Sequence, residues 1–156
     1  MTTDQSVQDA IYHSMLTEKD AMDFYRTASQ YVRNPDARKM LELLAQEERE
    51  HAEWFHRICH NVDLDEFLQL IDSGPAPDSV WISKLNAIAD LGHGELEILQ
   101  LAMRQEKDLE KELTEIASSA RNEDVRQIYE ANIESTRHHF ELIAEEYNRL
   151  KDLLGT

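Results

Sequence analysis

The chain has 156 residues, of which 32 are acidic and 16 are basic, so its formal net charge is −16. A chain of this length can form one domain with a substantial core. Its negative charge argues against binding to nucleic acid or to anionic membranes.

No segment approaches about 18 consecutive apolar residues, so we expect no membrane span. The N-terminal sequence "MTTDQSVQDA" lacks the basic and apolar regions of a secretory signal. The single cysteine, Cys59, suits a reducing cytoplasm and excludes both an internal disulfide and a metal knuckle built on paired cysteines. We therefore expect a cytoplasmic protein.

The first half of the chain predicts a helical hairpin over residues 5–59. The whole chain has only four glycines and three prolines, and residues of high helix propensity are abundant. A first helix is expected over about residues 5–31, with apolar side chains at helical spacing. The segment "RNPDAR" then starts a second helix, because Asn34 is a good N-cap and Pro35 suits the first helical position. This helix should end near Cys59.

The second half repeats this organisation after a long connection. Residues 60–79 contain a short apolar run, "FLQLI", and then the breaker "DSGPAPDS", which together predict a crossover with one short helix. A third helical region is expected over residues 80–120, interrupted at "GHG", residues 92–94. Asn122 in "RNEDVR" supplies the next N-cap for a helix that completes a second hairpin, residues 80–153.

The predicted fold is all-α: one domain, residues 1–156, forming a four-helix bundle with a long crossover between its second and third helices. An internal repeat supports this, because a shift of 88 residues matches 11 of 38 aligned positions without a gap. The tripeptide "EKD" at residues 18–20 falls on the same tripeptide at residues 106–108, and His51 falls on His139. Two hairpins of one design predict approximate two-fold symmetry.

Several titratable residues lie in phase with the apolar stripes of these helices, at positions that face the core. They are Glu18, Glu48, His51, Glu106 and His139. Because burying unpaired carboxylates is costly, they need a shared cation. Single glutamates from two helices, combined with a Glu-x-x-His motif, match the ligands of dinuclear metal centres inside bundles. Mixed carboxylate and imidazole ligands suit iron or manganese, with zinc as a further candidate.

These motifs resemble the rubrerythrin-type branch of the ferritin-like superfamily, over nearly the whole chain outside the crossover. The residues that carry the resemblance are Glu18, Tyr25, "EEREH" at residues 47–51, Glu106, and His139 in "TRHHF". The resemblance implies a non-haem di-iron centre that reduces peroxide or oxidises ferrous iron. It also implies that Tyr25 lies near the metals, although Tyr25 fits equally well as an ordinary aromatic core residue.

The resemblance also has implications for the electron donor and for the oligomeric state of the protein. Rubrerythrins proper carry a rubredoxin-like domain, in which four cysteines hold the iron that delivers electrons. Cys59 alone cannot form such a site, so a redox-active protein would need a separate electron donor. The resemblance further implies a homodimer or a larger homo-oligomer.

The second half departs from the pattern at Thr136, the counterpart of Glu48 in the repeat. A hydroxyl is a poor metal ligand unless it is deprotonated. Glu110, one turn after Glu106 on the inner stripe, is a tentative substitute; alternatively, it pairs with Arg or Lys at the edge of the bundle. Glu47, which flanks the motif on its polar side, is expected to face solvent.

Three classes of function remain open. The first is a redox enzyme, either a di-iron peroxidase or a ferroxidase. The second is a metal-binding or iron-handling protein with a degenerate second site and little turnover, which Thr136 favours. The third is a structural bundle that has lost its metal. The inward-facing candidate ligands argue against the third class, because an abandoned site should drift towards apolar packing.

Overall fold

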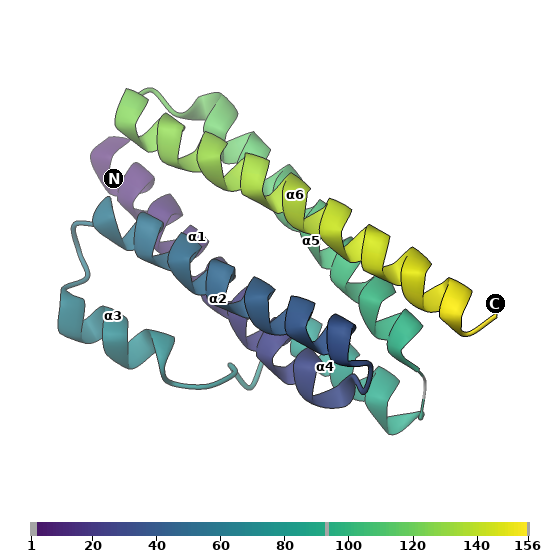
Figure 1. The fold of residues 1–156 in the computed structure, drawn as a ribbon. Helices are drawn as coiled ribbons and strands as arrows, with labels where there is room; N and C mark the ends of the chain where they lie inside the picture. Colours follow the sequence, from purple (N-terminus) through teal and green to yellow (C-terminus); the bar gives the residue numbers. More distant parts are fainter. Residues whose placement is uncertain (1–2, 93, 156) are drawn as a thin grey trace.

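The computed structural model describes residues 3–92 and 94–155, and all regular secondary structure in these ranges is α-helical. The helices are α1 (Thr3–Tyr31), α2 (Pro35–Arg57), α3 (Leu64–Ile71), α4 (Val80–Asp90), α5 (Glu95–Ser119) and α6 (Glu123–Leu153). Figure 1 shows the four longest, α1, α2, α5 and α6, running alongside one another, with the short helices α3 and α4 beside them. The all-α prediction is confirmed.

The starts of α2 and α6 follow the capping residues that the sequence predicts. The side chain of Asn34 accepts a hydrogen bond from the backbone N–H of Asp36 at 3.1 Å, and Pro35 is the first residue of α2. Asn122 does the same for α6 by accepting from the backbone N–H of Val125 at 3.1 Å. These bonds satisfy N–H groups that have no partner within their own helix.

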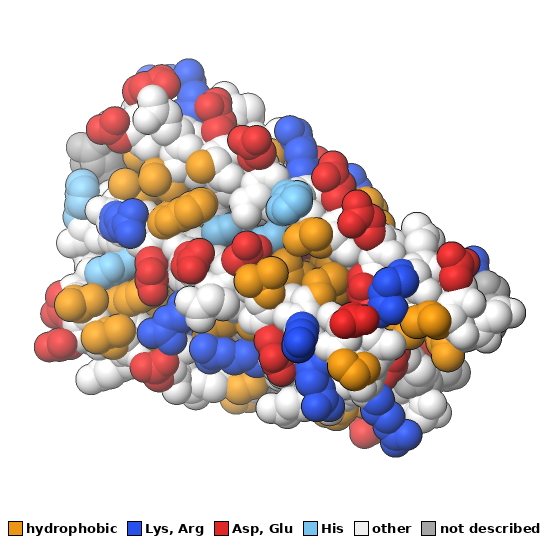
Figure 2. Space-filling view, in the orientation of Figure 1, with side chains coloured by type: hydrophobic (Ala, Val, Ile, Leu, Met, Phe, Trp, Pro, Cys, Tyr) orange, Lys and Arg blue, Asp and Glu red, His pale blue; other side chains and the backbone are white. Residues whose placement is uncertain are grey.

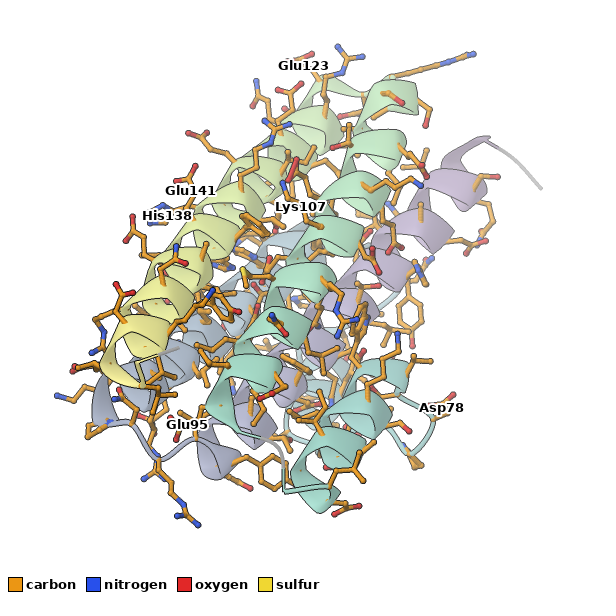
Figure 3. All side chains as sticks on the ribbon, turned by 90° about the vertical axis from the view of Figure 1, so that its right-hand side faces the viewer. Asp78, Glu95, Lys107, Glu123, His138 and Glu141 are labelled. Carbon is orange, nitrogen blue, oxygen red and sulfur yellow. The ribbon has the colours of Figure 1, made fainter. Side chains whose placement is uncertain are left out.

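Two helix pairs, α1 with α2 and α5 with α6, make the most extensive helix contacts among the described residues. Glu95, at the start of α5 (Figure 3), ties the pairs together at one end of the bundle. Its carboxylate accepts hydrogen bonds from the backbone N–H groups of Arg33 and Asn34. Arg149, near the end of α6, donates to the side chain of Asn34 at 3.0 Å. The turn between α1 and α2 is therefore held against the second pair.

The short helix expected at "FLQLI" is confirmed as α3. Asp63 caps it by accepting a hydrogen bond from the backbone N–H of Glu66 at 2.8 Å. Phe67 and Ile71, four residues apart, are its buried side chains. These two side chains anchor one face of α3 to the bundle. The whole segment between α2 and α4 runs along the outside of the bundle (Figure 1).

The interruption expected at residues 92–94 is also confirmed, because α4 ends before this segment and α5 begins after it. His93, expected in a loop or at a helix start, lies outside the described residues. The hydroxyl of Ser79 caps α4 by accepting from the backbone N–H of Ile82 at 3.2 Å. The helix then packs against both α1 and α5. It therefore closes one side of the bundle.

A continuous apolar core fills the space between the long helices, and its largest side chains include Phe24, Tyr25, Phe55 and Tyr129. No helix in the described part of the chain is both long enough and apolar enough to cross a membrane. Charged side chains are buried among these apolar groups, although ionised groups are normally excluded from a protein interior.

Candidate metal centre

The titratable side chains expected to face the core all lie in the interior. Glu18 comes from α1, Glu48 and His51 from α2, Glu106 from α5, and His139 from α6. None is more than 2 % exposed. Helical periodicity explains their position, because each lies three or four residues from a buried apolar neighbour on its own helix, as Glu18 does from Met15 and Met22.

These side chains form two groups that share Glu48. Glu18, Glu48 and His51 make one group, and Glu48, Glu106 and His139 make the other; within each, the potential ligand atoms lie within 4.8 Å of one another. Nδ1 of His51 is 3.5 Å from Glu18 and 3.8 Å from Glu48. Nδ1 of His139 is 2.8 Å from Glu48 and 3.6 Å from Glu106. Glu48 belongs to both groups, so it would be available to a metal ion held by either of them.

The two histidine rings lie face to face, with their centroids 5.3 Å apart and an angle of 7° between their planes. Both turn Nδ1 towards the carboxylate groups described above. Nε2 of His51 lies 2.8 Å from the hydroxyl of Ser135, and Nε2 of His139 lies 2.7 Å from the carboxylate of Glu47. Outer partners of this kind fix the tautomer and the orientation of metal-binding histidines. Figure 2 shows histidine side chains in the middle of one face of the molecule, between α2 and α6.

Most of the atoms that converge in this cluster have no hydrogen-bond partner. They are both carboxylate oxygens of Glu18 and of Glu48, Oε2 of Glu106, and Nδ1 of His51 and of His139. Even the close approach of His139 to Glu48 does not make a hydrogen bond at Nδ1. Buried charged groups without partners strongly destabilise a fold. A metal ion would satisfy oxygen and nitrogen atoms together, so the residues present fit a metal centre.

The electrostatics of the cluster also favour a bound cation. Burial, together with the charge of Glu18, raises the pKa of Glu48 well above its ordinary value of 4.5. Burial lowers the pKa of His139, but its contacts with the carboxylates of Glu106, Glu47 and Glu48 outweigh this effect and raise it to about 12. The pKa shifts at Glu48 and His139 thus show that these buried carboxylates need a positive charge nearby, which a bound metal ion would supply.

One known protein family has a sequence profile that covers most of the chain: the profile of Rubrerythrin matches residues 9–147. The chain belongs to the rubrerythrin family. No curated protein and no solved structure shows a significant match to it. The family membership expected from the glutamates, the "EEREH" motif and His139 is therefore confirmed.

Tyr25, which the rubrerythrin resemblance associates with the metals, contacts a candidate ligand. Its hydroxyl donates a hydrogen bond to Oε1 of Glu106, and its side chain is fully buried. Burial and the charges of Glu106 and Glu48 raise the pKa of Tyr25 well above 10.0, so the phenol remains a donor. Its ring also packs edge-on against Phe24, with centroids 5.3 Å apart. Tyr25 is thus both a core aromatic residue and the partner of Glu106.

Glu110 lies outside both groups of this rubrerythrin-family site. Its carboxylate accepts a hydrogen bond from Nε of Arg137 at 3.1 Å and lies 3.8 Å from the ammonium group of Lys107. This is the arrangement expected of a residue that pairs with basic side chains at the edge of the bundle. Thr136 is fully buried and donates its hydroxyl hydrogen to the backbone carbonyl of Asn132 at 2.7 Å. Neither side chain supplies a fourth carboxylate in this structure.

Glu47 differs from the sequence expectation, because it does not simply face solvent. Its side chain is two-thirds buried, at 33 % exposed, and accepts from His139. A signal for this contact was present in the internal repeat. A shift of 88 residues takes Glu47 to Ser135, and each of these residues contacts the histidine that belongs to the other half. The hydroxyl of Ser135 also lies 3.5 Å from Nε2 of His139 on its own helix.

Proposed function

We propose that this rubrerythrin-family protein holds two metal ions, iron before manganese or zinc, and acts as an oxidoreductase on peroxide or ferrous iron. The observation that carries this proposal is the convergence of buried, unpaired carboxylate and imidazole atoms from four helices. A purely structural core would leave these atoms paired with one another or replaced by apolar groups. The structural-bundle alternative is therefore the weakest of the three classes.

In this proposal each group described above holds one ion, and Glu48 contacts both. Iron bound by mixed carboxylate and imidazole ligands can change its oxidation state and so exchange electrons with peroxide or with ferrous iron. Manganese can do the same, whereas zinc would bind without redox chemistry. The ligand types thus support a redox role without distinguishing peroxide from ferrous iron as the substrate.

In this proposal the protein orients the ligand side chains, keeps the proton of the Tyr25 hydroxyl in place and excludes water from the site. Glu47 and Ser135 hold the two imidazole rings so that each Nδ1 faces the carboxylates. Tyr25 holds one oxygen of Glu106 and leaves the other free for a metal. Met15 and Met22, fully buried on either side of Glu18, keep that carboxylate away from bulk water. These contacts keep the ligand atoms ordered and dry.

A second candidate function is metal binding or iron handling with little turnover. This function is favoured by Thr136, which has a hydroxyl where the repeat predicts a carboxylate. Because that hydroxyl donates its hydrogen to a backbone carbonyl, it is not directed at a metal ion as a ligand. With three carboxylates instead of four, the two groups have to share Glu48, and the whole site carries less negative charge. The redox proposal is preferred because both groups retain a histidine and two glutamates.

We also interpret the architecture as two hairpins related by approximate two-fold symmetry and joined by a crossover. The parallel stacking of His51 and His139, which correspond in the repeat, supports this interpretation. So does the reciprocal contact of Glu47 with His139 and of Ser135 with His51. The segment that contains α3 and α4 would then be the crossover.

Sustained peroxide reduction requires an electron donor, and we propose a separate one; in the oxidation of ferrous iron, the iron itself would be the donor and peroxide the acceptor. The 156 residues contain one cysteine, Cys59, which is buried and free, so they cannot provide a four-cysteine iron site. A free thiol suits a reducing compartment, which supports the cytoplasm as the location. We also propose a homodimer or a larger homo-oligomer, on the basis of the family resemblance.

Metal analysis of the purified protein, with absorption spectra before and after peroxide addition, tests the proposal. We expect close to two iron ions per chain and a spectral response to peroxide. His51→Ala should fold and lose one ion. His138→Ala should retain both, because His138 is exposed on the outer side of α6 (Figure 3). Two ions without a spectral response would favour the binding function, and a folded, metal-free wild type would overturn both proposals.

A further inference from the structure

A cleft of about 740 Å³ lies at the side of the bundle, between α1, α5 and the segment that leads into α4. Asp20 of α1 and Gln105 of α5 line one wall, and residues 73–81 line the other. None of the candidate metal ligands is among the described residues that line it. The cleft is large enough for a small organic molecule and is separate from the metal centre.

Two hydrogen-bond acceptors in the walls of this cleft are buried without a partner. Oε1 of Gln105 and Oδ1 of Asp20 make no hydrogen bond to any described group, and Gln105 is only 5 % exposed. Burying an oxygen atom without a donor is unfavourable, and such atoms are few in folded proteins. A bound molecule that carries hydrogen-bond donors would satisfy both atoms.

The basic side chains that line the cleft are already engaged. The buried ammonium group of Lys19 binds the carboxylate of Asp23 and donates to the backbone carbonyl of Gly74 at 2.6 Å. Nε2 of His13 lies 2.8 Å from the carboxylate of Glu112. Each of these basic groups thus contacts an acceptor other than Asp20, and the acidic residues that line the cleft outnumber the basic ones, so the cleft can accept a positive charge from a ligand.

The remaining lining combines further negative charge with apolar surface. Asp108 of α5 and Asp78, on the loop before α4 (Figure 3), line the cleft together with Asp20. Leu109 and Trp81 are among the apolar side chains that line it. Acidic groups attract a cation, and apolar walls favour a ligand with a hydrocarbon part.

We propose that this cleft binds a small organic cation, a protonated primary amine with a short apolar stem. Its ammonium group would donate hydrogen bonds to Asp20 and Gln105, and its stem would lie against Leu109 and Trp81. A hydrated divalent metal ion is a poorer match, because it needs about six oxygen ligands and gains nothing from apolar walls. The inference does not depend on the metal centre.

Isothermal titration calorimetry of the full chain at pH 7 tests the proposal, with n-pentylammonium chloride as the probe. 1-Pentanol is the neutral counterpart, and magnesium chloride is the inorganic cation. We expect saturable binding of one amine per chain and at least about tenfold weaker binding of the alcohol, which lacks the charge. Asp20→Asn and Gln105→Met should each weaken amine binding about tenfold or more.

Asp65→Asn is the matched control, because Asp65 is an exposed acid on α3 that does not line the cleft. It should leave amine binding unchanged. Metal content, measured in each variant, separates this test from that of the metal centre. Absence of saturable amine binding, equal binding of the alcohol, or equal binding of magnesium would each overturn the proposal. If Gln105→Met fails to fold, the nearly isosteric Asp20→Asn decides the outcome alone.

Discussion

The two halves of the candidate metal centre present the same histidine atom in different surroundings. Nδ1 of His51 faces Glu18 and Glu48, which both come from the first helix pair. Nδ1 of His139 faces Glu106 from its own pair but has to share Glu48 with the first half. The second half of the repeat thus contributes one carboxylate where the first contributes two.

The groups that contact Nε2 of the two histidines also differ, but here the second half has the more negatively charged partner. Nε2 of His51 meets a neutral hydroxyl, that of Ser135, whereas Nε2 of His139 meets the negative carboxylate of Glu47. A carboxylate partner makes an imidazole a more basic ligand. The half that contributes fewer carboxylates would therefore offer the more basic imidazole to a metal ion. We propose that a repeated site can diverge in its candidate ligands while its outer contacts compensate for the change.

The largest effect should come from the residue that both halves share. Glu48→Gln keeps the size of the side chain but removes its charge, so metal content should fall from about two ions per chain to well below one. Elemental analysis of the purified variant measures this. Glu50→Gln, an exposed change on the same helix, is the control. A Glu48→Gln variant that retains two ions would show that the halves do not share this ligand.

Metal removal should lower the thermal stability of the protein, because bound metal ions would hold side chains of both halves together. A ligand present at about 100 times its Kd stabilises the native state by about 2.7 kcal/mol. Since about 1 kcal/mol shifts the Tm of a domain of this size by roughly 2–4 °C, chelation should lower the Tm by roughly 5–10 °C. Scanning calorimetry before and after chelation measures the shift. An unchanged melting curve, once metal loss has been verified, would count against a metal in the core.

The contacts of Glu47 and Ser135 with the histidines provide a more selective test of the difference between the two halves. Glu47→Gln should weaken the ion on the His139 side by about 10- to 100-fold, the range typical of such partners. Ser135→Ala should weaken the ion on the His51 side by less, because a neutral hydroxyl adds little basicity. Competition with a chromophoric chelator measures both affinities. If Ser135→Ala has the larger effect, the difference between the halves does not arise from the Glu47 charge.

The smallest effect is expected at Glu110. Its carboxylate pairs with Arg137, whose side chain is 59 % exposed, so the pair is worth less than about 1 kcal/mol. Glu110→Gln should keep both ions and reduce the free energy of unfolding by that amount at most. Metal analysis and urea denaturation check the two parts. Selective loss of one ion would mean that Glu110 moves inward to compensate for Thr136.

The long helices, their caps and the burial of the candidate ligands could be predicted from the sequence alone. Asn34 and Asn122 act on N–H groups only two or three residues away, so their effect can be read locally. Glu18, Glu48 and His139 could be assigned to the interior because helical spacing places them beside buried apolar residues. Both inferences depend on the geometry of a single helix, which does not change with its neighbours.

Contacts between side chains on different helices could not be predicted in this way and became apparent only in the folded structure. Glu110 lies in phase with the inner stripe, yet it pairs with Arg137 of α6 at the edge of the bundle. Glu47 lies outside the stripe, yet it reaches His139 because α2 and α6 are adjacent. The acceptors of Gln105 and Asp20 share one cleft only because residues 73–81 close its other wall. Helical period sets the direction of a side chain, whereas its partner depends on what the packed neighbour places within its reach.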